Sequence, residues 1–349
     1  MTRSRRLALV LPSLGLMTAL AAAPAVPTDR LVLRAQSSST APPAAGQGKS
    51  RAAAKGIGFP AIDSLPLIAD LAALAADSMD GRRLGTAGNI RARAYILRQF
   101  LAANLSPFAQ RFTFAFTAAR AGGTSTGTNL VGFHEGTKHP DRYIVLSAHY
   151  DHLGNKNGAI YHGADDNASG TAAVLGIARW LKDHPPENSV IIALFDGEEQ
   201  GLLGSKEFVT RSPVALDKLV ANVNLDMVGR NTKGELWAAG ATPWPVMRPL
   251  LDALAATAPV TLKLGHDSGT GQENWTQQSD QGPFHTARIP WVYFGVEDHP
   301  DYHQPSDTVG KIEQGFFVRS VRTIAEFVRR LDQGLDPVVA AKARAAADK

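Results

Sequence analysis

The sequence predicts a single α/β domain built on a mostly parallel, mixed β-sheet whose two faces are covered by helices. From about residue 143 onward, apolar runs of strand length alternate with amphipathic segments. The expected strands are short and rich in Val, Ile and Leu, as is typical of strands that helices bury on both faces. With 349 residues, 44% hydrophobic and 19% charged, the chain has enough apolar material for one sizeable core.

The order of the predicted elements follows from hydrophobic periodicity. Helices are expected at 64–76 and 89–105, on either side of a turn-rich segment at 80–86. The later elements are expected as strands at 143–148, 189–195, 220–225 and 290–295, and as helices at 169–182, 203–211, 245–257 and 312–331.

The first 25 residues have the layout of a secretory signal peptide. Arg3, Arg5 and Arg6 precede an apolar run from Leu7 to about Ala23, and small residues follow. A transmembrane anchor is the alternative, but a proline, a serine and a glycine interrupt a stretch that is barely long enough to span a bilayer. A twin-arginine signal is a second alternative that the following residues match poorly. We therefore expect cleavage, export by the ordinary secretory route, and a periplasmic or secreted protein.

The rest of the chain should divide into three parts. Residues 26–56 are expected to form a flexible linker, because a composition dominated by Ser, Ala, Pro, Gly and Gln cannot bury a core. The folded domain should cover 57–335, and 336–349 should form a tail that is frayed from about Ala340.

Composition narrows the range of partners. Removal of residues 1–25 takes away three positive charges, which lowers the formal net charge from +4 to +1, so no nucleic-acid partner is expected. The absence of cysteine excludes disulfides and thiolate metal sites. No other run is apolar enough to span a membrane, and we expect a monomer that does not bind one.

Polar clusters follow the predicted strands or lie in the loops beyond them. Each cluster alone has an ordinary explanation as a helix cap or a surface histidine, but ligands of open α/β sheets bind outside the carboxyl ends of the strands. Five clusters at corresponding places therefore predict a functional site. They are His149–Asp151, Gly163–Gly170, Asp196–Glu199, Leu225–Met227 and Tyr302–Asp307.

The residue types in these clusters suit a metal centre. His149 and Asp151 are two apart in an extended segment, so the imidazole could bind a metal while the carboxylate orients it. Histidine and carboxylate ligands suit Zn²⁺, with Co²⁺ or Mn²⁺ as possible substitutes. Two ions about 3.5–4 Å apart need a bridge, which a carboxylate of the Asp165–Asp166 pair could provide.

The adjacent acids Glu198 and Glu199 suggest a division of roles. One carboxylate would bind metal, and the other would act as a general base within hydrogen-bond reach of the attacking water. The alternative is a solvated acidic turn.

In order, spacing and residue type, these clusters resemble those of the co-catalytic zinc exopeptidases of the bacterial leucyl aminopeptidase family. The resemblance covers about 80–307 and includes the motifs at 127–132 and 279–284. It implies a phosphorylase/hydrolase-like zinc exopeptidase fold and two Zn²⁺ per chain. His149 and Asp226 would hold one ion, Glu199 and His303 the other, and Asp166 would bridge them.

The resemblance also implies roles around the metals. Asp151 would support His149, Glu198 would be the general base, and a cis peptide bond would follow Asp166. Tyr302 is the best candidate to stabilise the oxyanion. The chain departs from the pattern at Gln281, where many relatives have histidine, and in lacking the disulfide of some relatives. Six histidines have no place in the pattern and are expected in surface or supporting roles: His152, His162, His184, His266, His285 and His299.

The function implied is an aminopeptidase that removes N-terminal residues from peptides with a free amino end. A glutaminyl cyclase with one zinc is an alternative, although Glu199 runs into Gln200 without the long insertion typical of such cyclases. A carboxypeptidase or dipeptidase would need a cationic pocket that the sequence does not locate. A non-catalytic binding module would be expected to lack ligands, and none is missing.

Overall fold

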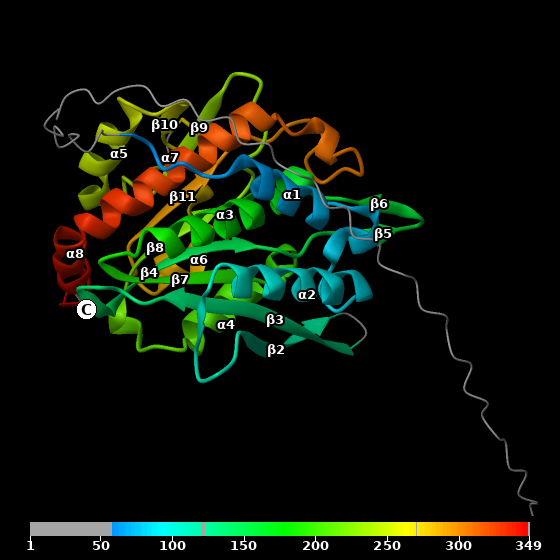
Figure 1. The fold of residues 1–349 in the computed structure, drawn as a ribbon, viewed down its shortest axis with the longest axis horizontal. Helices are drawn as coiled ribbons and strands as arrows, with labels where there is room; N and C mark the ends of the chain where they lie inside the picture. Colours follow the sequence, from blue (N-terminus) through cyan, green and yellow to red (C-terminus); the bar gives the residue numbers. More distant parts are fainter. Residues whose placement is uncertain (1–57, 121–122, 270, 348–349) are drawn as a thin grey trace, which may run out of the picture. The chain divides into compact units, whose positions relative to one another are not determined.

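The computed structural model describes residues 58–120, 123–269 and 271–347 (Figure 1). The expected signal peptide at 1–25 and linker at 26–56 lie outside the described residues. Within the described part of the chain, no helix combines the length and the apolar character needed to cross a membrane.

The core of the fold is a mixed β-sheet with the strand order β1-β3-β7-β4-β8-β11-β9-β10, and β2 pairs with β3. The four central strands β7, β4, β8 and β11 run parallel, whereas β3 joins β7, and β9 joins β11, in antiparallel fashion. The predicted mixed sheet is therefore confirmed. Its strands are β1 Ser106–Pro107, β2 Thr113–Arg120, β3 Gly123–His134, β4 His139–His149, β7 Asn188–Phe195, β8 Leu219–Leu225, β9 Glu235–Ala239, β10 Thr261–Leu264 and β11 Trp291–Gly295.

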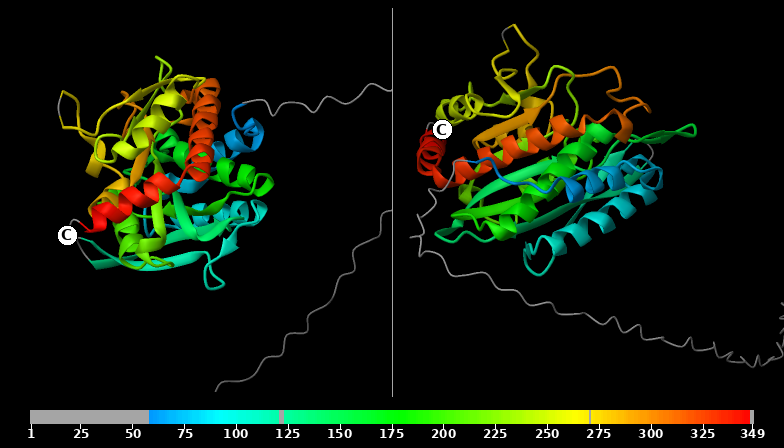
Figure 2. Two further views of the ribbon diagram at one scale, coloured as in Figure 1. Left: turned by 90° about the vertical axis from the view of Figure 1, so that its left-hand side faces the viewer. Right: turned by 45° about the horizontal axis from the view of Figure 1, so that its top comes forward.

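Helices cover both faces of this sheet (Figures 1 and 2). α1, α2, α3 and α7 pack on one face, and α4 and α6 pack on the other. A small separate hairpin, β5 Gly154–Lys156 and β6 Ala159–Tyr161, precedes α3. The helices are α1 Ser64–Leu74, α2 Ala87–Ala102, α3 Gly170–Asp183, α4 Leu203–Thr210, α5 Arg248–Ala255, α6 Gln281–Thr286, α7 Gln314–Gln333 and α8 Asp336–Ala347.

Successive side chains of the central strands enter two different cores. In β4, Ile144 and Leu146 belong to the core under α1, α2, α3 and α7, whereas Val145 belongs to the core under α4 and α6. All residues of β7 are buried. A strand with two buried faces has no solvent-facing positions, which is why these strands are mostly apolar, with a few buried polar residues such as Asn222 and Asn224 of β8.

The carboxyl ends of the four parallel strands reach the same edge of the sheet. His149 pairs with Phe195, and Phe294 pairs with Leu225, so the last residues of these strands lie nearly level. The polar residues that follow the strands are thereby brought together, as expected for ligand sites of open α/β sheets.

The C-terminal segment differs from the frayed tail that the sequence suggested beyond Ala340. It forms α8, in which Val338 is buried. The ammonium of Lys342 donates to the backbone oxygens of Leu216, Asp217 and Leu219. These contacts attach α8 to the segment that leads into β8, so the expectation of fraying was wrong.

Candidate metal centre

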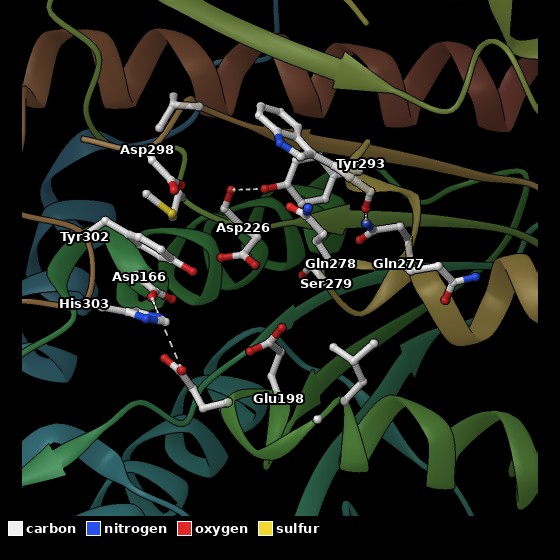
Figure 3. A pocket seen from close by; sticks show the side chains of 17 residues that line it. Asp166, Glu198, Asp226, Gln277, Gln278, Ser279, Tyr293, Asp298, Tyr302 and His303 are labelled. Atoms are coloured by element: carbon white, nitrogen blue, oxygen red, sulfur yellow. Dashed lines mark hydrogen bonds and ion pairs between the residues drawn. The ribbon is translucent and has the colours of Figure 1, made fainter. Parts of the chain in front are cut away.

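The five predicted metal ligands come from five separate segments and lie close together. Four of them line one cavity, in which Figure 3 labels Asp166, Asp226 and His303. Each segment follows a strand or joins a strand to a helix. His149 ends β4, Asp166 precedes α3, Glu199 follows β7, Asp226 follows β8, and His303 lies between β11 and α7.

Asp166 stands between two groups of donor atoms. Its Oδ1 lies 3.4 Å from Nε2 of His149, which is itself 3.2 Å from Oδ1 of Asp226. Its Oδ2 lies 3.1 Å from Nε2 of His303, which is 3.3 Å from Oε2 of Glu199. One carboxylate thus presents one oxygen to each histidine–carboxylate pair.

His152 also belongs to this cluster. Its side chain is fully buried, which excludes a surface role, and its Nδ1 lies 2.7 Å from Oε1 of Glu199 and 3.7 Å from Oδ2 of Asp166. Burial raises the pKa of Glu199, but the contacts with His152 and His303 outweigh burial and hold this pKa below its ordinary value. The signal that could have revealed His152 is its position directly after Asp151.

Glu198 faces the cavity from the turn after β7, opposite Asp226 (Figure 3). Burial raises the pKa of Glu198 well above its ordinary value, the charge of His149 opposes this rise, and the charge of Asp226 adds to it. Glu198 is adjacent to Glu199, yet the two carboxylates have different neighbours. This difference is what a division between base and ligand requires.

Asp151 connects His149 to the Glu198 turn. Nδ1 of His149 lies 3.2 Å from the backbone oxygen of Asp151 and 3.7 Å from its carboxylate. The other contact of this carboxylate is the backbone N–H of Glu198, which donates at 3.1 Å. The carbonyl is thus the nearer partner of the imidazole, and the carboxylate holds the turn.

Two further acids hold the loop that carries Asp166. The carboxylate of Asp307 accepts hydrogen bonds from the backbone N–H groups of Asp165 and Asp166 at 3.0–3.1 Å. Asp165 turns away from the cavity and contacts Gly229 N and His299 instead, as expected for a neighbour that is not a ligand. The peptide bond between Asp166 and Asn167 is cis, which confirms the expectation drawn from the resemblance.

Two tyrosines form the wall next to Asp226. Tyr302 stacks on His303 with ring centroids 3.9 Å apart, and its hydroxyl points into the cavity (Figure 3). Tyr293 donates its hydroxyl hydrogen to the backbone oxygen of Asp226 at 3.1 Å. Burial, followed by nearby carboxylates, raises the pKa of both hydroxyls, so both stay protonated and able to donate.

Asp280 is a further acid that the sequence did not single out. Its side chain is fully buried at the start of α6. Burial is the main reason why its pKa is raised to about 7; the charge of His149 opposes this rise, and the charges of Asp151 and Asp226 add to it. Gln281, at the position where many relatives have histidine, accepts a hydrogen bond from Asn224 and lines the cavity.

Arg82 contacts the backbone of two segments of the site, a structural role that the sequence did not reveal. Its buried guanidinium donates to four backbone oxygens, those of Leu74, Tyr150, His162 and Gly163, at 2.6–2.9 Å. Tyr150 lies between His149 and Asp151, and Gly163 begins the loop that carries Asp166. Arg82 therefore links the two segments that carry these candidate ligands.

Replacing Arg82 with methionine is expected to lower the free energy of unfolding by at least about 3 kcal/mol, because each buried carbonyl left without a donor costs about 1–3 kcal/mol. Urea unfolding of the metal-free protein measures this. Burial lowers the pKa of Arg82 to about 10, so the guanidinium is charged at neutral pH. The matched variant Arg83→Met removes a partly exposed arginine and should have a small effect; equal effects would contradict this account.

The remaining histidines of uncertain role make contacts outside the two donor groups. His162 contacts Asp77 at 2.8 Å, and His184 stacks on Trp180. His285 accepts from the indole N–H of Trp291. His266 stacks on Trp275, which lines the cavity. These positions agree with the surface or supporting roles expected from the sequence.

The cavity has a volume of about 340 Å³ and an acidic lining. It contains no lysine or arginine in its lining. Its carboxylates are those of Asp166, Glu198, Glu199, Asp226 and Asp298.

The donor set fits zinc. Two buried or half-buried groups, His149 with Glu198 and Asp226, and His152 with Asp166 and Glu199, each place potential ligand atoms within 4.8 Å of one another. All of these donors are imidazole nitrogens or carboxylate oxygens, which zinc binds readily in catalytic sites. So many buried carboxylates repel one another unless a cation compensates their charge.

Comparisons with known proteins identify a peptidase family. The profile of Peptidase family M28 matches residues 129–328. The chain is 35% identical over 212 residues to the Probable glutamate carboxypeptidase VP8 of Zea mays. The aligned region covers 55% of this chain and 28% of that protein. The chain is also 32% identical over 205 residues to Aminopeptidase YwaD of Bacillus subtilis, and this aligned region covers 54% of this chain and 41% of that protein. The chain thus spans less than half the length of these two relatives.

Solved structures share the fold. The zinc aminopeptidase BSAP from Bacillus subtilis superposes with a TM-score of 0.62 at 18% identity, covering 78% of this chain and 96% of that one. A glutaminyl cyclase from an Acidobacteriales bacterium superposes with a TM-score of 0.66 at 22% identity, covering 80% of this chain and 99% of that one. The expected fold and family are confirmed. Since the family profile matches more than half of its residues, the chain belongs to peptidase family M28.

Proposed function

We propose that this protein is an aminopeptidase that works with two zinc ions. His149 and Asp226 would hold one ion, His303 and Glu199 the other, and Asp166 would bridge them. The observation that carries the proposal is the position of Asp166, whose two oxygens face the two pairs separately. A site for a single ion would not need the second pair.

The residues around the metals would move the proton and orient the substrate. When bound, the ions would polarise the scissile carbonyl and acidify the attacking water. Glu198 would take the proton from this water as the C–O bond forms, and would give it to the leaving nitrogen as the C–N bond breaks. Asp151 would hold both His149 and the Glu198 turn in place. The protonated hydroxyl of Tyr302 would donate to the oxyanion.

The acidic lining supports a substrate with a free amino end. Asp166, Glu199 and Asp226 would bind the ions, so Glu198 and Asp298 are the lining carboxylates left to attract an ammonium group and to repel a carboxylate next to the scissile bond. A carboxypeptidase needs a cation at that place, whereas the lining contains no lysine or arginine. The lining therefore favours the activity named for the Bacillus relative over that named for the maize relative.

The proposal also includes where the enzyme acts. After removal of residues 1–25, the domain at 57–335 would hydrolyse peptides outside the cytoplasm as a monomer. Expression of the full chain with a C-terminal tag, followed by fractionation and N-terminal sequencing, tests this part independently of activity.

Zinc content and substrate preference test the function. We expect two zinc ions per chain by mass spectrometry of the dialysed protein, and hydrolysis of aminoacyl anilides. N-terminally acetylated peptides should be inert, and N-terminal glutaminyl peptides should lose glutamine without forming a cyclic product. A single ion with cyclisation would replace the proposal by a cyclase, and cleavage of acetylated peptides from the carboxyl end would replace it by a carboxypeptidase.

His152 is expected to position Glu199 without being a ligand itself. Replacing it with leucine removes the contact that fixes Oε1 and should weaken binding of one zinc ion about 10–100-fold, as losses of supporting contacts typically do. His152→Asn keeps a nitrogen near the place of Nδ1 and should restore most of the affinity. Competition with a chromophoric chelator measures both. A loss in the asparagine variant as large as in His303→Ala would instead make His152 a ligand.

A further inference from the structure

A second cavity, of about 370 Å³, adjoins the metal cavity. The two cavities share Leu202 and Gln277 as lining residues, so they meet at this point. The second cavity lies between α4 and α6 and is named the α4–α6 groove here. No residue of the candidate metal centre lines it.

The local sequence builds the groove from two helices. α4 and α6 pack through Phe208 and Phe284, whose ring centroids are 5.9 Å apart, and this contact holds the two helices together. Val209, Pro283 and Ala287 give the walls an apolar character. Thr210, Thr286 and Gln277 are its uncharged polar residues, so an extended peptide could place apolar side chains on the walls and still find hydrogen-bonding partners for its backbone.

The turn after β7 opens the metal cavity toward this groove. Gly201 and Leu202 both have positive φ values, of 100° and 61°, which turn the chain sharply between Glu198 and α4. Leu202 is thereby placed at the boundary, close to Gly282 at the start of α6. The leaving nitrogen would receive its proton from Glu198, so the peptide beyond the scissile bond should leave along this side.

The charge of the groove is opposite to that of the metal cavity. Lys206 is the charged residue among its lining, and its ammonium donates at 2.8 Å to the backbone oxygen of Gly201, which lines the metal cavity. Lys206 is exposed and forms no ion pair with the described residues. An ammonium has three N–H donors, so two remain for a ligand.

We propose that the α4–α6 groove binds the C-terminal part of a short peptide and that Lys206 holds its terminal carboxylate. This inference rests on the aminopeptidase function proposed above. An acidic cavity followed by a single cation matches a short zwitterionic peptide, whose ammonium and carboxylate lie at opposite ends. The substrate class is therefore short oligopeptides with a free carboxylate.

Matched substrates test the groove. We compare kcat/KM for Leu-Gly-Gly with that for its C-terminal amide, which has nearly the same shape but no negative charge. The zinc-loaded wild type should prefer the free acid about three- to fivefold, the range that an exposed ion pair provides. Lys206→Met should bring the ratio to about one, mainly through KM, and Lys206→Arg should keep the preference. Lys182→Met is the control, because Lys182 is also exposed and donates to a backbone oxygen, but on α3.

The outcomes separate the two proposals. Hydrolysis of leucyl anilide together with equal rates for the acid and the amide would overturn the groove and leave the aminopeptidase function standing. A preference for the acid that persists in Lys206→Met would also overturn it. Failure to hydrolyse any of these substrates with two zinc ions bound would overturn both proposals.

Discussion

Replacing Glu198 with glutamine is expected to lower kcat by about two to four orders of magnitude while both zinc ions stay bound. The amide has the size of the carboxylate but cannot accept the proton of the attacking water or return it to the leaving nitrogen. Steady-state hydrolysis of leucyl anilide measures the loss of turnover, and zinc per chain is measured on the same sample.

The zinc measurement decides between two positions for Glu198. Its carboxylate lies close enough to His149 and Asp226 to be a third ligand of that ion. If it were a ligand, Glu198→Gln would lose zinc as well as activity, and the assignment as base would be wrong. Glu297→Gln is the control, because Glu297 is an exposed acid that contacts His266 and lies outside the lining of the metal cavity.

The centre of the sheet could be predicted because burial leaves a strong pattern. The residues at 189–195 are nearly all apolar, and in the structure every one of them is buried. Where such a strand ends, the change to polar residues is abrupt, so Asp196 and Asp226 mark strand ends in the sequence itself. The five ligand candidates were found from these ends and from the resemblance, and the structure brings them together.

The edges of the sheet were not predicted, because one-sided burial leaves a weak pattern. In β2, Phe116 and Ala118 are buried while Thr117 between them is exposed, so the period of two is present. This alternating pattern is short, however, and the residues that follow it are mainly Gly, Ser and Thr, which are also common in loops. α8 was missed for a related reason, since its Ala- and Lys-rich sequence resembles a frayed end and only its contacts with the segment before β8 show that it is held.

The supporting residues of the site were missed because their partners lie far away in the chain. Arg82 donates to backbone oxygens, which any residue type can provide, so its partners leave no trace in the sequence. His152 contacts Glu199, which is 47 positions further along. Such contacts become visible only when the fold fixes which loops meet.

Asp166→Asn has the second large expected effect, and it falls on metal binding. An amide offers one neutral oxygen and one N–H₂ group, so it cannot present an acceptor to both histidine–carboxylate pairs. Zinc per chain should fall from two to one or fewer, and hydrolysis should be lost. Zinc should also stabilise the variant less. At saturating zinc, a 100-fold increase in Kd removes about 2.7 kcal/mol of the stabilisation that zinc provides. Asp165→Asn is the control and should keep both ions, because Asp165 turns away from the cavity.

The same exchange should have the opposite effect on the metal-free protein. Burial, followed by the charge of Glu199, raises the pKa of Asp166 above its ordinary value of 3.8. A carboxyl group whose pKa is raised in the folded state stabilises the fold at acid pH, and this contribution is lost as the pH rises through the raised value. In EDTA at pH 8, the buried charge therefore destabilises the wild type, and Asp166→Asn should be the more stable protein in urea. Its advantage should shrink as the pH falls through the raised pKa of Asp166, and added zinc at pH 8 should reverse the order. If the wild type is instead more stable than the variant in EDTA at pH 8, then neighbouring protein groups already balance the negative charge of Asp166 without a metal. The buried carboxylates would then not require bound cations.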